Sequence, residues 1–337
     1  MGNEFLFFRI ILILIVIIYS MKRLFLIKNP CVFQGEKYLE LNKDYFEGWY
    51  FKNTNNKISI SFIPGININK SKRYAFIQVI TDNSSYYVDY DIKEFEYGYD
   101  PFYIRIGNNY FSKDSIKVDI SCDNLTIKGE LNYSDSININ TSNSSPNIMG
   151  IFSYVPFMEC NHTVISMKNK INGSINISGK EFIFKDGYGY GYIEKDWGYS
   201  FPDSYIWLQG NNFSSNSKVA FMMSIANIPF KIFNFRGLIC SLIIDNYEYR
   251  FATYNGSKIL KYNIDNNKID ITIKKGNYYL DVTGNLDKGN SLKAPVNGSM
   301  EKDIIESISS IIKVTLRKDN EILFSDSSNN CGLEIVK

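Results

Sequence analysis

The chain has 337 residues, a formal net charge of +2 and five cysteines. This length suits either two domains of ordinary size or one large β architecture. The charge is small and the lysines are scattered, so nothing in the sequence favours binding to nucleic acid. The cysteines are odd in number and lack CxxC spacing, so neither a zinc site nor a disulfide framework is indicated.

The first 28 residues form an apolar amino-terminal segment. Residues 10–18 contain no polar side chain, but the run is shorter than the roughly 20 residues of a comfortable membrane span. No small-residue cleavage site follows it, which disfavours a secretory signal peptide. Two interpretations stay open. The segment is a signal anchor with Lys22 and its neighbours on the cytoplasmic side, or Met21 is the true start and the protein is soluble and cytoplasmic.

Short runs of alternating apolar and polar residues dominate the chain after residue 30. Examples are KISISFIPG at 57–65, YAFIQVIT at 74–81 and KIDITIKK at 268–275. Their period of two predicts half-buried antiparallel strands, and Asn172-Gly173 and Asn255-Gly256 supply turns between runs. One helix is expected over residues 300–310, where three isoleucines follow helical spacing between acidic residues.

An internal similarity indicates two β units. FEGWYFK at 46–52 and YIWLQGNNF at 205–213 each contain tryptophan and each lead into a strongly apolar strand. Glycines interrupt the strand pattern over residues 180–191. We therefore expect a mainly β protein with two antiparallel barrel or sandwich units side by side, at residues 29–185 and 186–337, after the apolar segment 1–28.

His162 is the one histidine of the chain. A His-rich metal site is therefore excluded, and no metal is expected. We interpret His162 as a histidine satisfied in a turn. The glycines at 187, 189 and 191 lack both the spacing and the following helix of a nucleotide-binding loop.

The kind of chemistry that the sequence still indicates is acid-base chemistry by carboxylates surrounded by aromatic residues. Glu47 lies in FEGWYF, and Glu194 and Asp196 flank Lys195. One interpretation places the last two carboxylates in a solvated turn, paired with Lys195 or Arg236. The alternative is burial, which would raise the pKa of a carboxyl group until it could act as a general acid at neutral pH. The aromatic residues that would surround it are Tyr190, Tyr192, Trp197, Tyr205 and Trp207, although such residues usually form core.

At these residues the chain resembles the tocopherol cyclase family. The resemblance is carried by NPCVFQG at 29–35, FEGWYFK at 46–52, GYGYIEKDWGYSFPDSYIWLQ at 189–209, PVNGSMEKDIIESI at 295–308 and GLEI at 332–335. The central block is the most specific. The order of the motifs is that of the family, and together they extend over nearly everything after residue 28.

The resemblance implies two lipocalin-like barrels with an apolar cleft, and a cofactor-free cyclisation of a prenylated quinol, an apolar small-molecule partner. An acid would protonate the alkene and the phenolic oxygen would close the ring. Asp196 or Glu194 would donate the proton, and Glu47 or Tyr50 would accept or orient the phenolic proton. The substrate-binding residues would be Trp49, Tyr50, Tyr190, Tyr192, Trp197, Tyr205, Trp207 and Gln209, with Trp197 and Trp207 facing the carbocation.

A competing function uses the same apolar interior without chemistry. A lipid-binding module needs only an apolar pocket, whereas charged groups inside such a pocket are costly. The direction in which Glu194 and Asp196 face separates the two functions, because outward carboxylates favour carriage. Fold resemblance does not determine the substrate, which could be another isoprenoid lipid.

Overall fold

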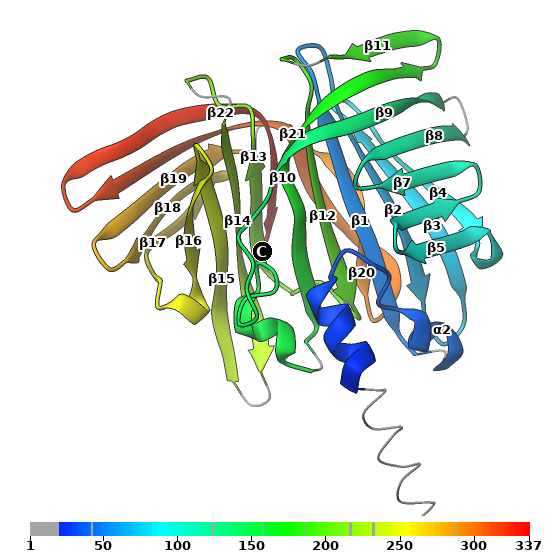
Figure 1. Cartoon of the computed structure of the whole chain (residues 1–337), viewed down its shortest axis with the longest axis horizontal. Helices are drawn as coiled ribbons and strands as arrows, with labels where there is room; N and C mark the ends of the chain where they lie inside the picture. Colours follow the sequence, from blue (N-terminus) through cyan, green and yellow to red (C-terminus); the bar gives the residue numbers. More distant parts are fainter. Residues whose placement is uncertain are drawn as a thin grey trace, which may run out of the picture.

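The computed structural model describes residues 20–41, 43–122, 125–156, 158–185, 187–215, 218–230, 233–286 and 288–337. Strands dominate, and they form two antiparallel sheets that lie side by side (Figure 1). The short helical elements are residues 20–28, α2 (Glu36–Leu41), η1 (Ile92–Glu94), η2 (Gly150–Tyr154) and η3 (Thr253–Asn255). The mainly β architecture with two units is confirmed.

The first sheet has 12 strands. Eleven follow the order β4 (Ser85–Asp91), β3 (Arg73–Thr81), β2 (Ser59–Ile68), β1 (Tyr45–Thr54), β12 (Tyr190–Gly198), β10 (Cys160–Ile177), β9 (Leu125–Ile137), β8 (Ser115–Cys122), β7 (Asn109–Ser112), β6 (Phe102–Ile106) and β5 (Phe95–Tyr99), and β11 (Lys180–Phe184) pairs with β10. The strand β12 therefore lies between β1 and β10.

The second sheet has 10 strands. Nine follow the order β16 (Tyr247–Ala252), β15 (Phe233–Ile244), β14 (Val219–Phe230), β13 (Tyr205–Gly210), β22 (Glu321–Val336), β21 (Ser299–Lys318), β19 (Tyr278–Asn285), β18 (Lys268–Lys275) and β17 (Lys258–Asp265), and β20 (Asn290–Val296) pairs with β21.

The two sheets repeat one arrangement. A meander of four strands, β1 to β4 in the first sheet and β13 to β16 in the second, begins with the tryptophan strand that the internal similarity singled out. The other edge of that strand pairs with β12 or β22, respectively. The change of sheet comes later than the expected boundary at residue 186, because β12 pairs within the first sheet and the second begins at β13. Of the glycines in the interrupted stretch, Gly187 and Gly189 lie between β11 and β12, and Gly191 belongs to β12.

The helix expected over residues 300–310 is wrong, because this segment is part of the long strand β21. Ile304, Glu306 and Ile308 are buried, whereas Ile305 is exposed. The spacing of four between Ile304 and Ile308 fits a helical face and a strand face equally well. Residues 300–310 form a strand because this segment pairs with β20 and β22.

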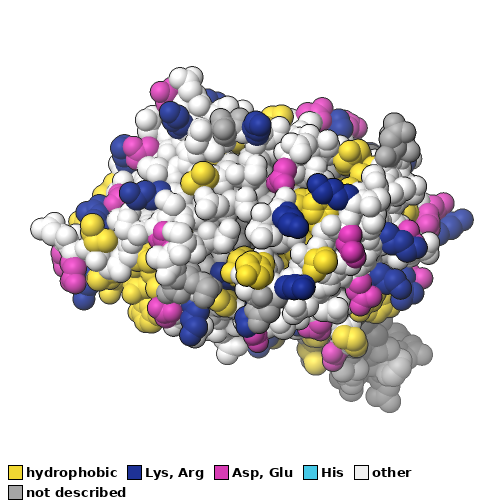
Figure 2. Space-filling model, turned by 90° about the horizontal axis from the view of Figure 1, so that it is seen from above, with side chains coloured by type: hydrophobic (Ala, Val, Ile, Leu, Met, Phe, Trp, Pro, Cys, Tyr) yellow, Lys and Arg dark blue, Asp and Glu magenta, His cyan; other side chains and the backbone are white. Residues whose placement is uncertain are grey.

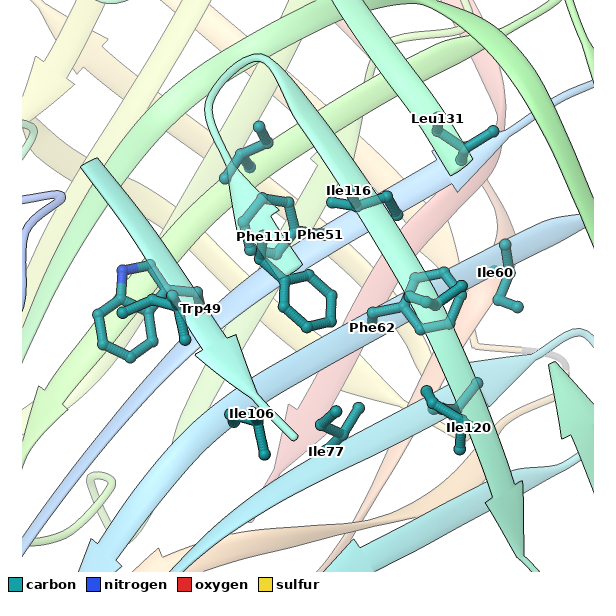
Figure 3. Close-up of a cluster of buried hydrophobic side chains, with 14 of the residues drawn as sticks. Trp49, Phe51, Ile60, Phe62, Ile77, Ile106, Phe111, Ile116, Ile120 and Leu131 are labelled. Carbon is teal, nitrogen blue, oxygen red and sulfur yellow. The ribbon is translucent and has the colours of Figure 1, made fainter. Parts of the chain in front are cut away.

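Each sheet curves around its own apolar core. In the first, Phe111 of β7 lies 5.4 Å from Phe51 of β1 and 6.5 Å from Phe62 of β2, measured between ring centroids. Figure 3 shows these rings, with Trp49, among aliphatic side chains. The interior of this unit is thus filled by side chains. A third apolar cluster lies between the sheets.

The surface shows no large field of one sign on the face drawn in Figure 2, where basic and acidic side chains are interspersed. This agrees with the small net charge.

Most of the apolar amino-terminal segment lies outside the described residues. Its last part, residues 20–28, is helical, and Arg23 donates a 2.9 Å hydrogen bond to the Tyr154 carbonyl. Within the part of the chain that the structure describes, no helix has the length and apolar character needed to cross a membrane.

Candidate active site between the two sheets

Strand β12 presents different chemistry on its two faces. Side chains alternate along a strand, so Glu194 and Asp196 share one face and Lys195 takes the other. Both carboxylates line a cavity between the sheets, whereas Lys195 is fully buried in the first unit. The solvated-turn interpretation of Glu194 and Asp196 is therefore wrong.

The cavity receives side chains from both sheets. The space between its walls, including the open mouth, amounts to about 1260 Å³. Most of the wall is apolar, and the side chains that carry the argument below are Tyr50, His162, Glu194, Asp196, Tyr205, Trp207, Glu306 and Glu334. A largely apolar pocket with a few converging polar groups is typical of a small-molecule site.

His162 lies between the two carboxylates of β12. It belongs to β10, directly opposite Asp196 in the strand register. Its Nδ1 is 2.9 Å from Asp196 Oδ1, and its Nε2 is 3.5 Å from Glu194 Oε2. The side chains are 12% exposed for His162, 6% for Glu194 and 23% for Asp196. His162 is thus a cavity residue in a strand, and its assignment to a turn is wrong.

Glu194 is held by two hydrogen-bond donors. The Tyr192 hydroxyl donates to Glu194 Oε2 at 2.5 Å, and Trp207 Nε1 donates to the same oxygen at 3.1 Å. Tyr192 belongs to β12 and Trp207 to β13, so the second sheet helps to orient an acid of the first.

The pKa values of His162 and Glu194 are both raised in this cluster. Burial opposes a charge on His162, but Asp196 and Glu194 outweigh this effect and raise the pKa of His162 to about 9. Burial raises the pKa of Glu194 to about 7, against the opposing effect of His162. At neutral pH Glu194 can therefore hold or release a proton beside a charged imidazolium.

A second acidic pair lies in the cavity wall of the other sheet. Glu306 of β21 and Glu334 of β22 are opposite each other in the strand register. The Tyr50 hydroxyl donates to Glu306 Oε1 and the Tyr205 hydroxyl donates to Glu334 Oε2, each at 2.5 Å.

Sequence reasoning gave no role to His162, Glu306 or Glu334. A signal existed for each, since His162 is the one histidine and the two glutamates lie in segments that carry the family resemblance. Because a helix was predicted over residues 300–310, the sequence analysis did not identify the strand face on which Glu306 lies.

Among the predicted aromatic residues, Tyr50, Tyr205 and Trp207 line the cavity. Tyr192 is buried behind the wall, where it supports Glu194. The Tyr50 ring lies 5.4 Å from Trp207 at an interplanar angle of 74°. Tyr50, Tyr192, Tyr205 and Trp207 therefore lie close together at the cavity, and their contact with a substrate stays a prediction.

Glu47, Trp49 and Trp197 do not join this site, since they lie on the opposite faces of β1 and β12. Lys195 Nζ is 2.5 Å from Glu47 Oε1 and also lies over both tryptophan rings, at 5.0 Å from Trp49 and 4.5 Å from Trp197. The Trp49 indole donates to the Cys31 carbonyl. The assignment of Glu47 to the reacting group and of Trp197 to the cation-binding wall is therefore wrong.

Tyr190 and Gln209 also lie away from the cavity wall. The Tyr190 ring lies under Lys168 Nζ at 4.1 Å, and its hydroxyl donates to the Gly187 carbonyl. Gln209 is fully buried on β13. Because neither described side chain lines the cavity, their expected contact with substrate has no support here.

One donor from each of His162, Glu194 and Asp196 lies within 4.8 Å of the other two, which is close enough for a small divalent cation. The ring nitrogens of His162, however, face different carboxylates, and a single ion can take only one of them. The geometry fits hydrogen-bonded proton exchange better than a shared ligand set.

Comparison with known proteins places the chain in context. Residues 113–336 match the family model described as tocopherol cyclase-like. The crystal structure of a protein assigned as AttH from Nitrosomonas europaea superposes with a TM-score of 0.52 and 11% identity, over 87% of this chain and 93% of that one. The structure of CghA with Sch210972 gives 0.56 and 7%, over 87% and 88%. At these identities the two structures support the fold alone. The comparison with curated proteins gives no match.

Proposed function

This chain belongs to the tocopherol cyclase-like family, and we propose that it is a cofactor-independent enzyme that cyclises or isomerises a prenylated quinol or a related isoprenoid lipid. The observation that carries the proposal is the buried carboxyl group of Glu194, which faces a mostly apolar cavity and has a pKa of about 7. A carboxylic acid kept neutral by its surroundings is a general acid at physiological pH.

The first step is proton transfer from Glu194 to the alkene of the substrate. The O–H bond of the acid breaks, a C–H bond forms, and the remaining substituted carbon becomes a cation. The imidazolium of His162, 3.5 Å from Glu194, stabilises the carboxylate left behind. Asp196 holds His162 in place through the 2.9 Å contact at Nδ1.

Ring closure completes the reaction. The aromatic rings of Tyr50 and Trp207 line the cavity, and their faces suit a transient carbocation. The phenolic oxygen attacks the cationic carbon and forms a C–O bond. Its proton returns to the carboxylate of Glu194, so one proton enters and one leaves and the acid is regenerated.

The cost of the acidic cluster disfavours the alternative, a non-catalytic lipid-binding module. A carrier would bind its ligand with an apolar wall, and four acidic side chains in that wall would lower both stability and affinity. The inward direction of Glu194 and Asp196 supports the enzyme.

The test is turnover of a prenylated hydroquinone in D₂O, followed by mass spectrometry. The enzyme should give a ring-closed product with one deuterium on the former alkene carbon. Glu194→Gln should abolish this product while quenching of tryptophan fluorescence shows that the quinol still binds. The matched control is Glu130→Gln, which changes an exposed glutamate of β9 and should turn over normally. A wild-type protein that returns the bound quinol unchanged would establish the carrier.

A further inference from the structure

The acidic pair of the second sheet has a geometry that the proposed proton transfer does not use. Glu306 is 0% exposed, and its carboxyl group lines the cavity. The Tyr50 hydroxyl donates to Oε1, while no donor among the described residues reaches Oε2. The facing carboxyl group of Glu334 is close enough to share a hydrogen bond with Glu306 when one of the two is protonated. A buried polar atom without a donor is costly, so a ligand hydroxyl that donates to Oε2 would supply the contact that the described donors leave out.

The charges around the pair favour its neutral form. Four carboxyl groups line the cavity, and His162 and Lys293 are the described cationic side chains in its wall. Lys293 already pairs with Asp303 at 3.0 Å. Behind the wall, Lys52 donates to the Asn330 carbonyl and to Thr54 Oγ1. Two cations, one of them neutralised elsewhere, cannot balance four carboxylates in an apolar setting.

The pKa shifts of Glu306 and Glu334 agree with this excess of carboxyl groups over cations. Burial, with the neighbouring Glu334, raises the pKa of Glu306 well above its ordinary value. Burial also raises the pKa of Glu334 to about 8, although the Tyr205 hydrogen bond acts in the opposite direction. A protonated carboxyl group both donates and accepts, so it can bind a carbonyl or a hydroxyl oxygen.

We propose that Glu306 and Glu334 form a polar binding site for the head of an apolar ligand, in which Oε2 of Glu306 hydrogen-bonds a phenol hydroxyl or a quinone carbonyl. The assignment of the ligand class rests on the proposed function. Tyr50 links this site to the acid, because its hydroxyl bonds Glu306 and its ring contacts Trp207, which in turn bonds Glu194. An aromatic head held at Glu306 would lie in the same cavity as Glu194.

The test is binding of dodecylhydroquinone, measured against dodecylbenzene, which has the same chain and no oxygen. Neither compound has an alkene, so the measurement is independent of turnover. Wild type should prefer the hydroquinone by about tenfold, the value of one buried hydrogen bond. Glu306→Leu should abolish that preference without weakening dodecylbenzene. Glu306→Gln keeps a neutral donor and acceptor and should retain the preference.

A pH series distinguishes ligand binding by the neutral carboxyl group of Glu306 from a merely structural role of this residue. The series is informative even if Glu306→Gln is the one variant that folds. Wild-type affinity for the hydroquinone should fall as pH rises through about 8, the pKa of Glu334 in this pair, and Glu306→Gln, which leaves one carboxyl group of the two, should be less sensitive. The proposal is overturned if Glu306→Leu leaves the preference intact, or if Glu306→Gln loses it or retains the full pH dependence. Loss of turnover in Glu194→Gln with an unchanged preference in Glu306→Leu would reject this site alone. The converse result would reject the proposed reaction alone.

Discussion

The two faces of β12 both bury carboxylates, and they differ in how the charge is compensated. On the face toward the first core, Glu47 meets Lys195 at 2.5 Å and also accepts from Tyr45 and the backbone of Gln34. Lys195 donates in turn to the carbonyls of Pro30 and Val32. The contacts with the backbone of Gln34, Pro30 and Val32 attach the chain that precedes β1 to the sheet.

On the cavity face, Glu194, Asp196, Glu306 and Glu334 outnumber the cations near them. Their charges cannot all be satisfied, so protons must be retained and pKa values move toward neutrality. Burial alone therefore does not identify a candidate general acid. The cavity face combines burial with incomplete charge compensation and with access to a cavity.

The largest expected effect is on the cavity face. Glu194→Gln should lower turnover by about 10²- to 10⁴-fold, the usual contribution of a general acid. The free energy of unfolding should stay the same or rise, because a buried ionisable group is replaced by a neutral one of equal size. Product formation and chemical denaturation measure the two quantities, and a marked loss of stability would erase the contrast between the faces.

On the core face, Lys195→Met should lower the free energy of unfolding by about 3–5 kcal/mol, since it leaves Glu47 buried without its cation. Glu47→Gln added to Lys195→Met should restore part of the loss. Urea denaturation gives both values. Turnover per folded molecule should be unaffected. A selective loss of turnover would contradict the structural role of Glu47 and indicate that it takes part in the reaction.

The cavity face should also give the protein a pH dependence. The proposed reaction needs protonated Glu194, so kcat/KM should fall about tenfold per pH unit above pH 7. The folded-state pKa of His162 is raised from 6.5 to about 9, so its stabilising effect is complete below pH 6.5 and is lost as pH rises through 9. Melting temperatures from pH 6.5 to 9 should therefore decline less in His162→Gln than in wild type.

The smallest effect should come from Gly332 of β22, which lies against Trp207. A Cβ atom at this position would be 2.5 Å from the Trp207 ring. Gly332→Ala should cost about 1–3 kcal/mol of stability and lower turnover by displacing the donor to Glu194. If the Gly332→Ala protein has unchanged tryptophan fluorescence and turnover, the position of the Trp207 ring is unimportant for the reaction. Gly256→Ala, with open space around the glycine but a φ of +83°, is the control for backbone strain without a contact.

The sequence by itself determined much of the architecture. Period-two runs and turn residues predicted the strands, and the similarity of 46–52 to 205–213 predicted two units, because these signals are local. Alternation also required Glu194 and Asp196 to share a face opposite Lys195. The helix predicted over residues 300–310 failed because a spacing of four fits a helix and a strand alike.

The face of β12 that meets the cavity is set by the packing of the two sheets. Glu194 and Asp196 turn inward because their face of the first sheet lies toward the second, and the pairing of β12 with β10 places His162, 34 residues from Asp196 in sequence, against both acids. Tyr50 and Glu306 meet across 256 residues. The period of two along a strand specifies which side chains share a face, but it does not specify which strands lie beside it. The groups that compensate a charge, and hence its pKa, come from distant strands.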